Sequence, residues 1–490
     1  MEQASKAAKT SVLALDLGAS SGRAIVGTYD DDTGLVLREV HRFENGPKPN
    51  TLPLQWDYGA LLSNVIAGIH KASRDYELTS VGIDTWGVDY GLIDSRGDLI
   101  SNPVHYRDSR TDGLTAELEE DGRLDGVYPI TGTQKMDINT LVQLIASKAS
   151  NPSELKDADD ALLMPDLLIY SLTGEKASEV SMASTTQLMD TRTGTWSEAV
   201  FERFGLRGDL FPPIVEEGSA AGTLKRDVHH DPIPVVRVCE HDTASAVASL
   251  SLTEDDLFIS CGTWSLVGTK REQPVLTQEA ERMNVTNERG DGGSTLLLKN
   301  CTGLWIAQEL RRNLVDLYGE APSWVEIARL AFEAQPFAHL IDTNDPIFEK
   351  PGNMVERIND WLVQAGQEQI DPTDIGALYR CVYESLALQY RESKEQLEKI
   401  TGRAFKAVHL IGGGAQNKFL CQAVSDVMGC RVEAGPYEAT AVGNILVQLV
   451  AAGAFASLSE ARAAVAHSVR HDVYEPRIEF DELMKGMQHA

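Results

Sequence analysis

The stretch LDLGASSGRAIVG, from Leu15 to Gly27, reads as a strand, a tight glycine-rich turn and a second strand, with an aspartate at the end of the first strand. Its glycines permit tight turning, its serines offer hydroxyls and Arg23 supplies a fixed fork of donors. Together these groups can hold a phosphate chain, and Asp16 can organise Mg²⁺ through water. The stretch alone also permits a plain hairpin whose aspartate caps the turn.

A second stretch of the same design predicts an internal repeat. DLFISCGTWSLVGTK, residues Asp256 to Lys270, again reads as strand, glycine turn and strand, and Gly262 lies 244 positions after Gly18. Because this offset is almost half the chain, we predict two similar domains, residues 1–248 and 249–490, each starting with a hairpin. Chance is the alternative, since hairpins with glycine turns are common.

Strand-like and helix-like segments alternate around these hairpins. IPVVRVCE, KAVHLIGGG and CRVEAG have the apolar character of strands, whereas GALLSNVIAGIHKAS, RCVYESLALQYRESKEQLEKI and FLCQAVSDVMG have helical periodicity. This alternation predicts an α/β fold. Hairpins at the start of each domain favour a sheet with an antiparallel edge over a purely parallel barrel.

Composition excludes several classes of partner. The 490 residues include 44 Lys+Arg against 73 Asp+Glu, and the net charge of −29 repels nucleic acid and anionic membrane surfaces. A local nest of N–H groups can still bind a small phosphorylated ligand. Six cysteines without a C-x-x-C pair predict neither a zinc site nor a disulfide framework, and they fit a reducing cytoplasm. No apolar run has the length of about 20 residues that a membrane span needs.

The segment VCEHDTASAVASL places His241, Asp242 and Thr243 where an apolar strand gives way to small residues. Polar groups at the carboxyl end of a strand are where α/β folds keep their sites, and an aspartate there can accept a hydroxyl proton during phosphoryl transfer. Taken alone, this segment also fits a helix N-cap, with Asp242 accepting from the following N–H groups.

Two neighbouring segments, GIDTWGVDYGLID and VHYRDSRTDG, mix carboxylates with aromatic rings. A carbohydrate site needs this mixture, because polar groups pair with the hydroxyls while a flat ring covers the apolar face of the sugar. The alternative is that Trp86 and Tyr90 belong to the core and that the charges belong to solvated turns.

Two nucleotide-binding patterns bear on the cofactor. No G-x-x-x-x-G-K-[ST] occurs, so a Walker-type ATPase is not supported. The segment AVHLIGGGAQNKFLCQAVSDVMGCRVEAG could belong to a dinucleotide-binding fold, with Glu433 about 20 residues after its first glycine, but Asn417 occupies the third glycine position. A nucleotide pressed against Gly412 to Gly414 is compatible with the same residues.

Together the motifs resemble the FGGY family of carbohydrate kinases, and most closely its members that phosphorylate L-rhamnulose. The resemblance spans nearly the whole chain and rests on LDLGASSGR, GIDTWGVDYGLID, YRDSRTDG, INTLVQL, LLMPD, ASTTQLMD, HDTASAV, SCGTWSLVG, NVTNERG, LKNCTGLW and GGGAQN…AGPYEATAVGN, in the family's order. Two departures, Cys261 for a usual serine and Cys301-Thr302 for a usual apolar pair, leave the flanking polar residues intact.

The resemblance implies two ribonuclease-H-like (actin-like ATPase) domains flanking a deep cleft, with sugar bound mainly by the first domain and ATP mainly by the second. It implies the phosphorylation of L-rhamnulose at the 1-hydroxyl by ATP with Mg²⁺, a step of L-rhamnose catabolism. Asp242 is the implied general base, and the implied sugar contacts are Gly87, His241, Asp242, Thr243 and Asn300. The implied ATP contacts are Ala19, Ser20, Ser21, Gly22, Arg23, Thr263, Gln308 and Gly414.

We therefore expect a cytoplasmic kinase, monomer or homodimer, whose partners are a sugar and ATP rather than nucleic acid or membrane. The sequence leaves other functions open. One is a sister kinase acting on another ketose or polyol, such as fuculose or xylulose. A sugar- or nucleotide-sensing module that kept the fold would release no ADP with any sugar. A nicotinamide-dependent dehydrogenase would bind NAD.

Overall fold

The computed structural model describes residues 9–478, which form two compact units. Unit 1 contains the chain up to Ser251 together with Arg271–Leu297 and Ala439–Val469. Unit 2 contains Leu252–Lys270, Leu298–Glu438 and the chain from Arg470. Each unit is therefore assembled from segments that are distant in sequence.

A six-stranded sheet forms the centre of unit 1, in the order β11-β12-β4-β1-β2-β3. β1 pairs antiparallel with β2 and parallel with β4, so the quoted hairpin lies in the middle of a mixed sheet. The strands are β1 Thr10–Leu17, β2 Ser21–Asp30, β3 Gly34–Glu44, β4 Ser80–Thr85, β11 Ala220–Thr223 and β12 Pro234–Val236.

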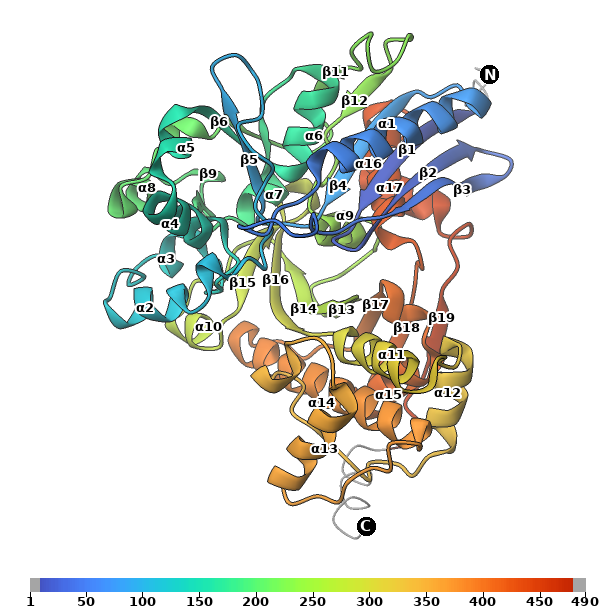
Figure 1. Ribbon diagram of the computed structural model, residues 1–490. Helices are drawn as coiled ribbons and strands as arrows, with labels where there is room; N and C mark the ends of the chain where they lie inside the picture. Colours follow the sequence, from blue (N-terminus) through green and yellow to red (C-terminus); the bar gives the residue numbers. More distant parts are fainter. Residues whose placement is uncertain (1–8, 479–490) are drawn as a thin grey trace. The chain divides into compact units, whose positions relative to one another are not determined.

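Helices cover both faces of this sheet. Strand β1 is therefore buried on both sides. Leu13, Leu15 and Leu17 share a core with α1 (Tyr58–Asp75) and α6 (Met164–Thr173), whereas Val12 and Ala14 pack against α16 (Ala439–Ala451) and α17 (Leu458–Val465). The alternation follows the two-residue period of a strand. Figure 1 shows α1 running along the strands of this sheet.

The remaining elements of unit 1 are short. The helices are α2 Leu114–Glu120, α3 Tyr128–Thr131, α4 Thr140–Ser150, α5 Pro152–Asp157, α7 Val180–Ser184, α8 Glu198–Phe204, α9 Asp242–Ala248 and α10 Gln278–Arg282, with 3₁₀ turns at Ser109–Thr111, Gly208–Leu210 and Asp291–Gly293. The strands are β5 Tyr90–Asp94, β6 Ala158–Leu163, β7 Ser178–Glu179, β8 Met189–Asp190, β9 Thr195–Trp196, β10 Ile214–Val215 and β15 Thr286–Arg289.

Unit 2 has a sheet of the same design. Its strands follow the order β16-β14-β13-β17-β18-β19. β13 pairs antiparallel with β14 and parallel with β17, as β1 does with β2 and β4. The strands are β13 Asp256–Cys261, β14 Trp264–Arg271, β16 Thr295–Thr302, β17 Ala407–Ile411, β18 Arg431–Ala434 and β19 Asp472–Tyr474. The duplicated strand order confirms the predicted repeat.

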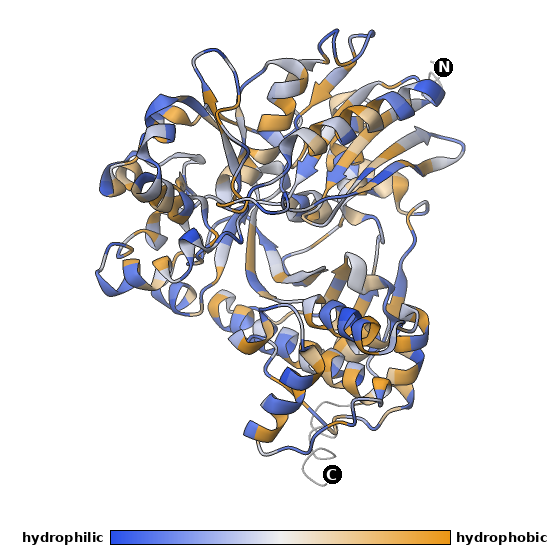
Figure 2. Ribbon diagram, in the orientation of Figure 1, coloured by the Kyte–Doolittle hydropathy of each residue, from blue (hydrophilic) through white to orange (hydrophobic). Residues whose placement is uncertain are grey.

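Amphipathic helices surround the second sheet. They are α11 Trp305–Tyr318, α12 Trp324–Glu333, α13 Met354–Gln364, α14 Ile375–Thr401 and α15 Lys418–Met428, with 3₁₀ turns η4 Pro346–Phe348 and η5 Gly413–Gln416. In Figure 2 these helices carry hydrophobic and hydrophilic residues in alternating bands, as expected for helices with one buried face. Among residues 9–478, no helix is long and apolar enough to cross a membrane.

Candidate active site

The turn between β1 and β2 has the geometry of a small open loop. Arg23 lies directly across the hairpin from Asp16 and donates to its carboxylate through Nη2. The Gly18 N–H donates to the Ser21 carbonyl at 2.9 Å, and the Asn45 side chain donates to the Gly18 carbonyl at 2.9 Å. The predicted ATP contacts from Ala19 to Arg23 therefore lie in this turn and in the first three residues of β2, within unit 1.

A second carboxylate lies beside Asp16. Asp84 is fully buried on β4, in register with Asp16 on β1, and accepts from the Asn444 side chain at 2.6 Å. Burial and the neighbouring Asp16 charge raise the pKa of Asp84 well above its ordinary value. Its Oδ1 atom makes no hydrogen bond with any residue of the described chain. Two adjacent carboxylates, one with an unused oxygen, fit a hard cation such as Mg²⁺.

Asp242 is the first residue of α9. The N-cap position belongs to His241, so the sequence-based alternative that Asp242 is the N-cap is wrong. The Asp242 side chain keeps 34% of its surface exposed, and it accepts from the Thr243 hydroxyl at 3.2 Å. Surrounding protein atoms raise the pKa of Asp242, while the nearby His241 charge lowers it. The result is a partly exposed carboxylate with a pKa raised above its ordinary value.

His241 lies between two carboxylates. Its Nε2 atom is 3.5 Å from Asp242 Oδ1, and its Nδ1 atom is 3.2 Å from Oε2 of Glu288 on β15. Burial lowers the pKa of His241, but attraction to Glu288 and Asp242 outweighs it and raises the pKa to about 9. The imidazole ring is therefore positively charged at neutral pH.

A buried polar frame holds the backbone that precedes Asp242. The carboxylate of Glu179 caps α7 and also accepts from the Glu240 N–H at 3.1 Å, and the Ser181 hydroxyl accepts from the His241 N–H at 3.0 Å. Burial raises the pKa of Glu179 to about 8. Arg237 pairs with Glu240 at 3.1 Å within the same interior cluster. These contacts fix the chain where β-structure changes into α9.

Helix α16 sets the position of α9 from the other side. The two helices touch backbone to backbone at Gly443, where a Cβ atom would lie 2.8 Å from the Ser245 carbonyl carbon. The Ser245 hydroxyl also donates to the Thr440 carbonyl at 3.0 Å. Gln448 reaches from α16 to the Leu13 carbonyl of β1 at 3.0 Å. The helix that carries Asp242 is thus locked to the sheet that carries Asp16.

The predicted sugar contact Gly87 lies just after β4, beside a strained residue. A Cβ atom at Gly87 would lie 3.1 Å from Thr185 Cγ2, and the next residue, Val88, has φ 70°. This left-handed conformation is rare for a β-branched side chain, and such strain is concentrated at binding sites. The Thr185 hydroxyl accepts from the Val88 N–H at 3.2 Å and holds the strained loop in place.

The aromatic residues around this loop are core residues, as the alternative interpretation held. Trp86 and Tyr90 are buried, and the indole N–H groups of Trp56 and Trp86 both donate to Asp89, at 2.7 and 3.0 Å. Burial raises the pKa of Asp89 to about 6. His105 stacks on Trp56 with ring centroids 4.2 Å apart. The expected flat ring over a sugar is therefore not provided by Trp86.

The other predicted contacts lie in unit 2. The Thr263 hydroxyl, in the turn after β13, donates to Gln308 on α11 at 3.4 Å. Gly412 has φ 79°, and a Cβ atom at Gly414 would lie 2.7 Å from the Cβ atom of Cys261 and closer still to its sulfur. The predicted sugar contact Asn300 lies on β16. The structure thus brings Thr263 and Gln308 together and presses the glycine turn against β13.

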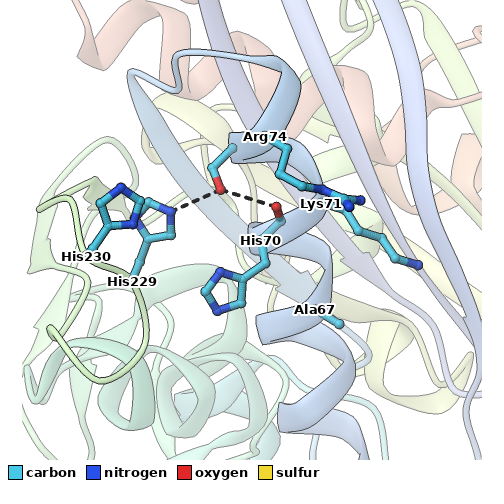
Figure 3. Close-up of a pocket in the computed structure, with 7 residues that line it drawn as sticks. Ala67, His70, Lys71, Arg74, His229 and His230 are labelled. Carbon is cyan, nitrogen blue, oxygen red and sulfur yellow. Dashed lines mark hydrogen bonds between the residues drawn. The ribbon is translucent and has the colours of Figure 1, made fainter.

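A separate hollow of about 560 Å³ in unit 1 contains none of the predicted site residues. It is lined by residues of α1 and by His229 and His230. Figure 3 shows Lys71 and Arg74 extending away from the two histidines. His229, His230 and Asp231 bring possible ligand atoms within 4.8 Å of one another. However, both ring nitrogens of His229 already have partners, the Ser73 hydroxyl at 3.0 Å and the Asp231 N–H at 3.2 Å. We therefore assign His229 a structural role.

Sequence reasoning missed Glu288, Glu179 and Asn444. Glu288 lies within NVTNERG, a motif that supported the family resemblance, but nothing in the local pattern pairs it with His241, 47 positions earlier. Glu179 lies between the motifs LLMPD and ASTTQLMD and has no distinguishing spacing. A charged residue inside a strand-like segment is the one sequence feature that could have marked a functional residue here, and Glu288 has that feature.

Comparison with known proteins gives one consistent family. The N-terminal domain of the FGGY family of carbohydrate kinases matches residues 11–249, and its C-terminal domain matches residues 257–452. The chain is 38% identical to a rhamnulokinase of Bacillus subtilis, over 95% of each chain. It is 37% identical to a rhamnulokinase of Bacteroides thetaiotaomicron, over 96% of each chain.

Solved structures with lower identity share the fold. A gluconate kinase from Lactobacillus acidophilus superimposes with a TM-score of 0.79 at 15% identity, covering 98% of this chain and 96% of the other. Plasmodium falciparum glycerol kinase with ADP gives 0.78 at 19% identity, with the same coverage. These likenesses confirm the predicted two-domain α/β sugar kinase fold.

Proposed function

This chain belongs to the FGGY family of carbohydrate kinases, and from that premise we propose that it transfers the γ-phosphoryl group of ATP to the 1-hydroxyl of L-rhamnulose. The choice of sugar is supported by relatives named rhamnulokinase at 36–38% identity over nearly the whole chain. As a kinase of this family, the chain uses ATP as co-substrate together with Mg²⁺.

In the proposed reaction Asp242 accepts the proton of the sugar 1-hydroxyl. The oxygen so activated forms a bond to the γ-phosphorus, and the bond between that phosphorus and the bridging oxygen of ADP breaks. The products are L-rhamnulose 1-phosphate and ADP, and the proton remains on the Asp242 carboxyl until solvent removes it. A partly exposed carboxylate with a raised pKa suits this role, because a base works best with a pKa close to the working pH.

We propose that Gly87, His241, Thr243 and Asn300 contact the sugar. His241 and Thr243 flank the base, and the Gly87 loop is held in a strained conformation that suits a close contact. For ATP we propose contacts from Ala19, Ser20, Ser21, Gly22, Arg23, Thr263, Gln308 and Gly414. Turns with accessible N–H groups and an arginine fork match a phosphate chain.

Asp16 and Asp84 fit a magnesium ion, which would neutralise charge on the phosphate oxygens. We propose that Asp16 holds the ion through water. The raised pKa of Asp84 favours its neutral form in the free protein, and a nearby divalent cation would favour the ionised form. Arg23 keeps the Asp16 carboxylate oriented, since it donates to one of its oxygens.

The observation that carries this proposal is the reachable Asp242 carboxylate, held beside a charged His241 by a buried frame. The test is a coupled ADP-release assay of the purified chain across a sugar panel with L-rhamnulose, L-fuculose, D-xylulose and glycerol. We expect the highest kcat/KM with L-rhamnulose. Equal or better turnover of another sugar would overturn the substrate, and no ADP release with any sugar would favour a sensing module.

A sister kinase for another ketose or polyol is the second candidate, because solved structures with this fold include gluconate, xylulose and glycerol kinases. The division into domains 1–248 and 249–490, the cytoplasmic location and the monomeric or homodimeric state stay predictions. Mass measurement in solution tests the last of these.

A further inference from the structure

A buried glutamate lies against His241 and has no part in the reaction proposed above. Glu288 keeps 7% of its side chain exposed, and its Oε2 atom is 3.2 Å from His241 Nδ1. The opposite ring nitrogen is 3.5 Å from Asp242 Oδ1. The three side chains form a row of carboxylate, imidazole and carboxylate. Asp242 is the most exposed member of that row, at 34%.

We propose that Glu288 is a positioning residue for phosphoryl transfer, which holds the His241 ring positively charged with Nε2 toward Asp242. Glu288 acts on the reaction only through that ring. The inference rests on the proposed function, because it takes Asp242 as the group that accepts the sugar proton.

Helix α7 fixes both members of the Glu288–His241 pair. The Ser181 hydroxyl accepts from the His241 N–H at 3.0 Å, and the Ser184 hydroxyl accepts from the N–H of Arg289, the residue after Glu288, at 2.9 Å. Residues three apart lie on one face of a helix, so one short helix sets the spacing. On the other side of Glu288, the Asn287 N–H donates to the Gly132 carbonyl at 2.9 Å.

The charges around the row support the same role. Burial alone lowers the pKa of His241, and Glu288 is the largest influence that raises it. Glu179, the N-cap residue of α7, also interacts with the ring, whereas Asp16, Asp84 and Tyr106 interact with Asp242. The Asp16 carboxylate raises the pKa of Asp242 and so favours its protonated form, whereas Asp84 and Tyr106, whose own pKa values are raised, are neutral at neutral pH. The positive charge on the His241 ring lowers the pKa of Asp242 and opposes the effect of Asp16. A neutral ring would therefore stabilise the Asp242 carboxylate less.

The hydrogen-bond geometry between His241 and Glu288 can still improve. His241 Nδ1 and Glu288 Oε2 lie at ion-pair distance, yet neither makes an aligned hydrogen bond with any residue that the structure describes. Catalytic hydrogen bonds in unliganded enzymes are often poorly aligned and improve when substrate binds. A small rotation of the ring, driven by sugar in contact with its other side, would align the pair.

The test is a double-mutant cycle with Glu288→Gln and His241→Asn, measured by ADP release with L-rhamnulose and ATP. We expect each single variant to lower kcat/KM for the sugar by about tenfold or more, with KM for ATP within about twofold of wild type. The double variant should fall within about twofold of His241→Asn alone. Glu288→Asp, which keeps the charge, should recover most of the activity.

Glu281→Gln is the matched control, because Glu281 lies in the same chain segment but pairs with Lys135 at 3.1 Å. It should retain wild-type kinetics. Independent effects that multiply in the double variant, or wild-type kcat/KM in Glu288→Gln, would overturn the inference. If Glu288→Gln does not fold, Glu288→Ala, which also removes the carboxylate, replaces it in the cycle with and without His241→Asn. A wild-type chain that prefers another sugar contradicts the proposed substrate instead, and the cycle is then run with that sugar.

Discussion

Replacing Gly443 with alanine tests whether the packing of α16 on α9 sets the position of Asp242. The new Cβ atom would lie 2.8 Å from the Ser245 carbonyl carbon and closer still to its oxygen, whereas ordinary contacts begin at 3.4 Å. The neighbours are backbone atoms, so no side chain can rotate away. The two helices must separate by on the order of 1 Å, and Ser245 lies one turn from Asp242.

A misplacement of about 1 Å can reduce turnover about 10²-fold, and overpacking costs roughly 1–3 kcal/mol of stability. We therefore expect Gly443→Ala to lower kcat by about 10²-fold and to lower the free energy of unfolding. The assays are coupled ADP release and denaturant unfolding. The control is Gly59→Ala, an exposed helical position where a Cβ atom has space, 3.9 Å from its nearest neighbour. Wild-type kcat and stability in Gly443→Ala would refute the reasoning.

Three further predictions follow from the geometry. Gly414→Ala should raise KM for ATP and leave KM for the sugar unchanged, because its Cβ atom would meet Cys261 at 2.7 Å and displace the glycine turn; an unchanged KM for ATP contradicts this. Burial raises the pKa of Asp242 above the ordinary value of about 3.9, so kcat should fall as the pH drops through that raised pKa and Asp242 becomes protonated. A kcat that stays constant down to about pH 4 would exclude Asp242 as the base. Ser73→Ala should leave the buried His229 ring without its 3.0 Å hydrogen-bond partner (Figure 3) and lower the free energy of unfolding by about 1–3 kcal/mol, with kcat unchanged. Undiminished stability in a denaturant titration would contradict the structural role of His229.

Local patterns in the sequence predicted the repeated hairpins and several helices. The hairpin at Leu15–Gly27 forms β1 and β2, and the segment RCVYESLALQYRESKEQLEKI lies within α14. These elements follow from periodicity and turn residues, which act over a few positions. The sequence predicts Asp16 at the end of the first strand, and it is the next-to-last residue of β1, which ends at Leu17.

The frame around Asp242 could not be predicted in this way, because its members come from distant segments. Asn444 donates to Asp84 from 360 positions away, and Glu288 reaches His241 from a strand that local patterning does not connect to α9. The sequence also left open whether Trp86 covers a sugar or packs in the core. Burial decides that question, since its indole N–H is used by the buried Asp89.

The measurement that tests the central claim most directly is single-turnover phosphoryl transfer by Asp242→Asn, with calorimetric binding of L-rhamnulose and of ATP to the same protein. If Asp242 accepts the sugar proton, both ligands will bind within about threefold of wild type while the transfer rate falls at least about 10²-fold. A transfer rate within tenfold of wild type, with both ligands bound, would contradict the account.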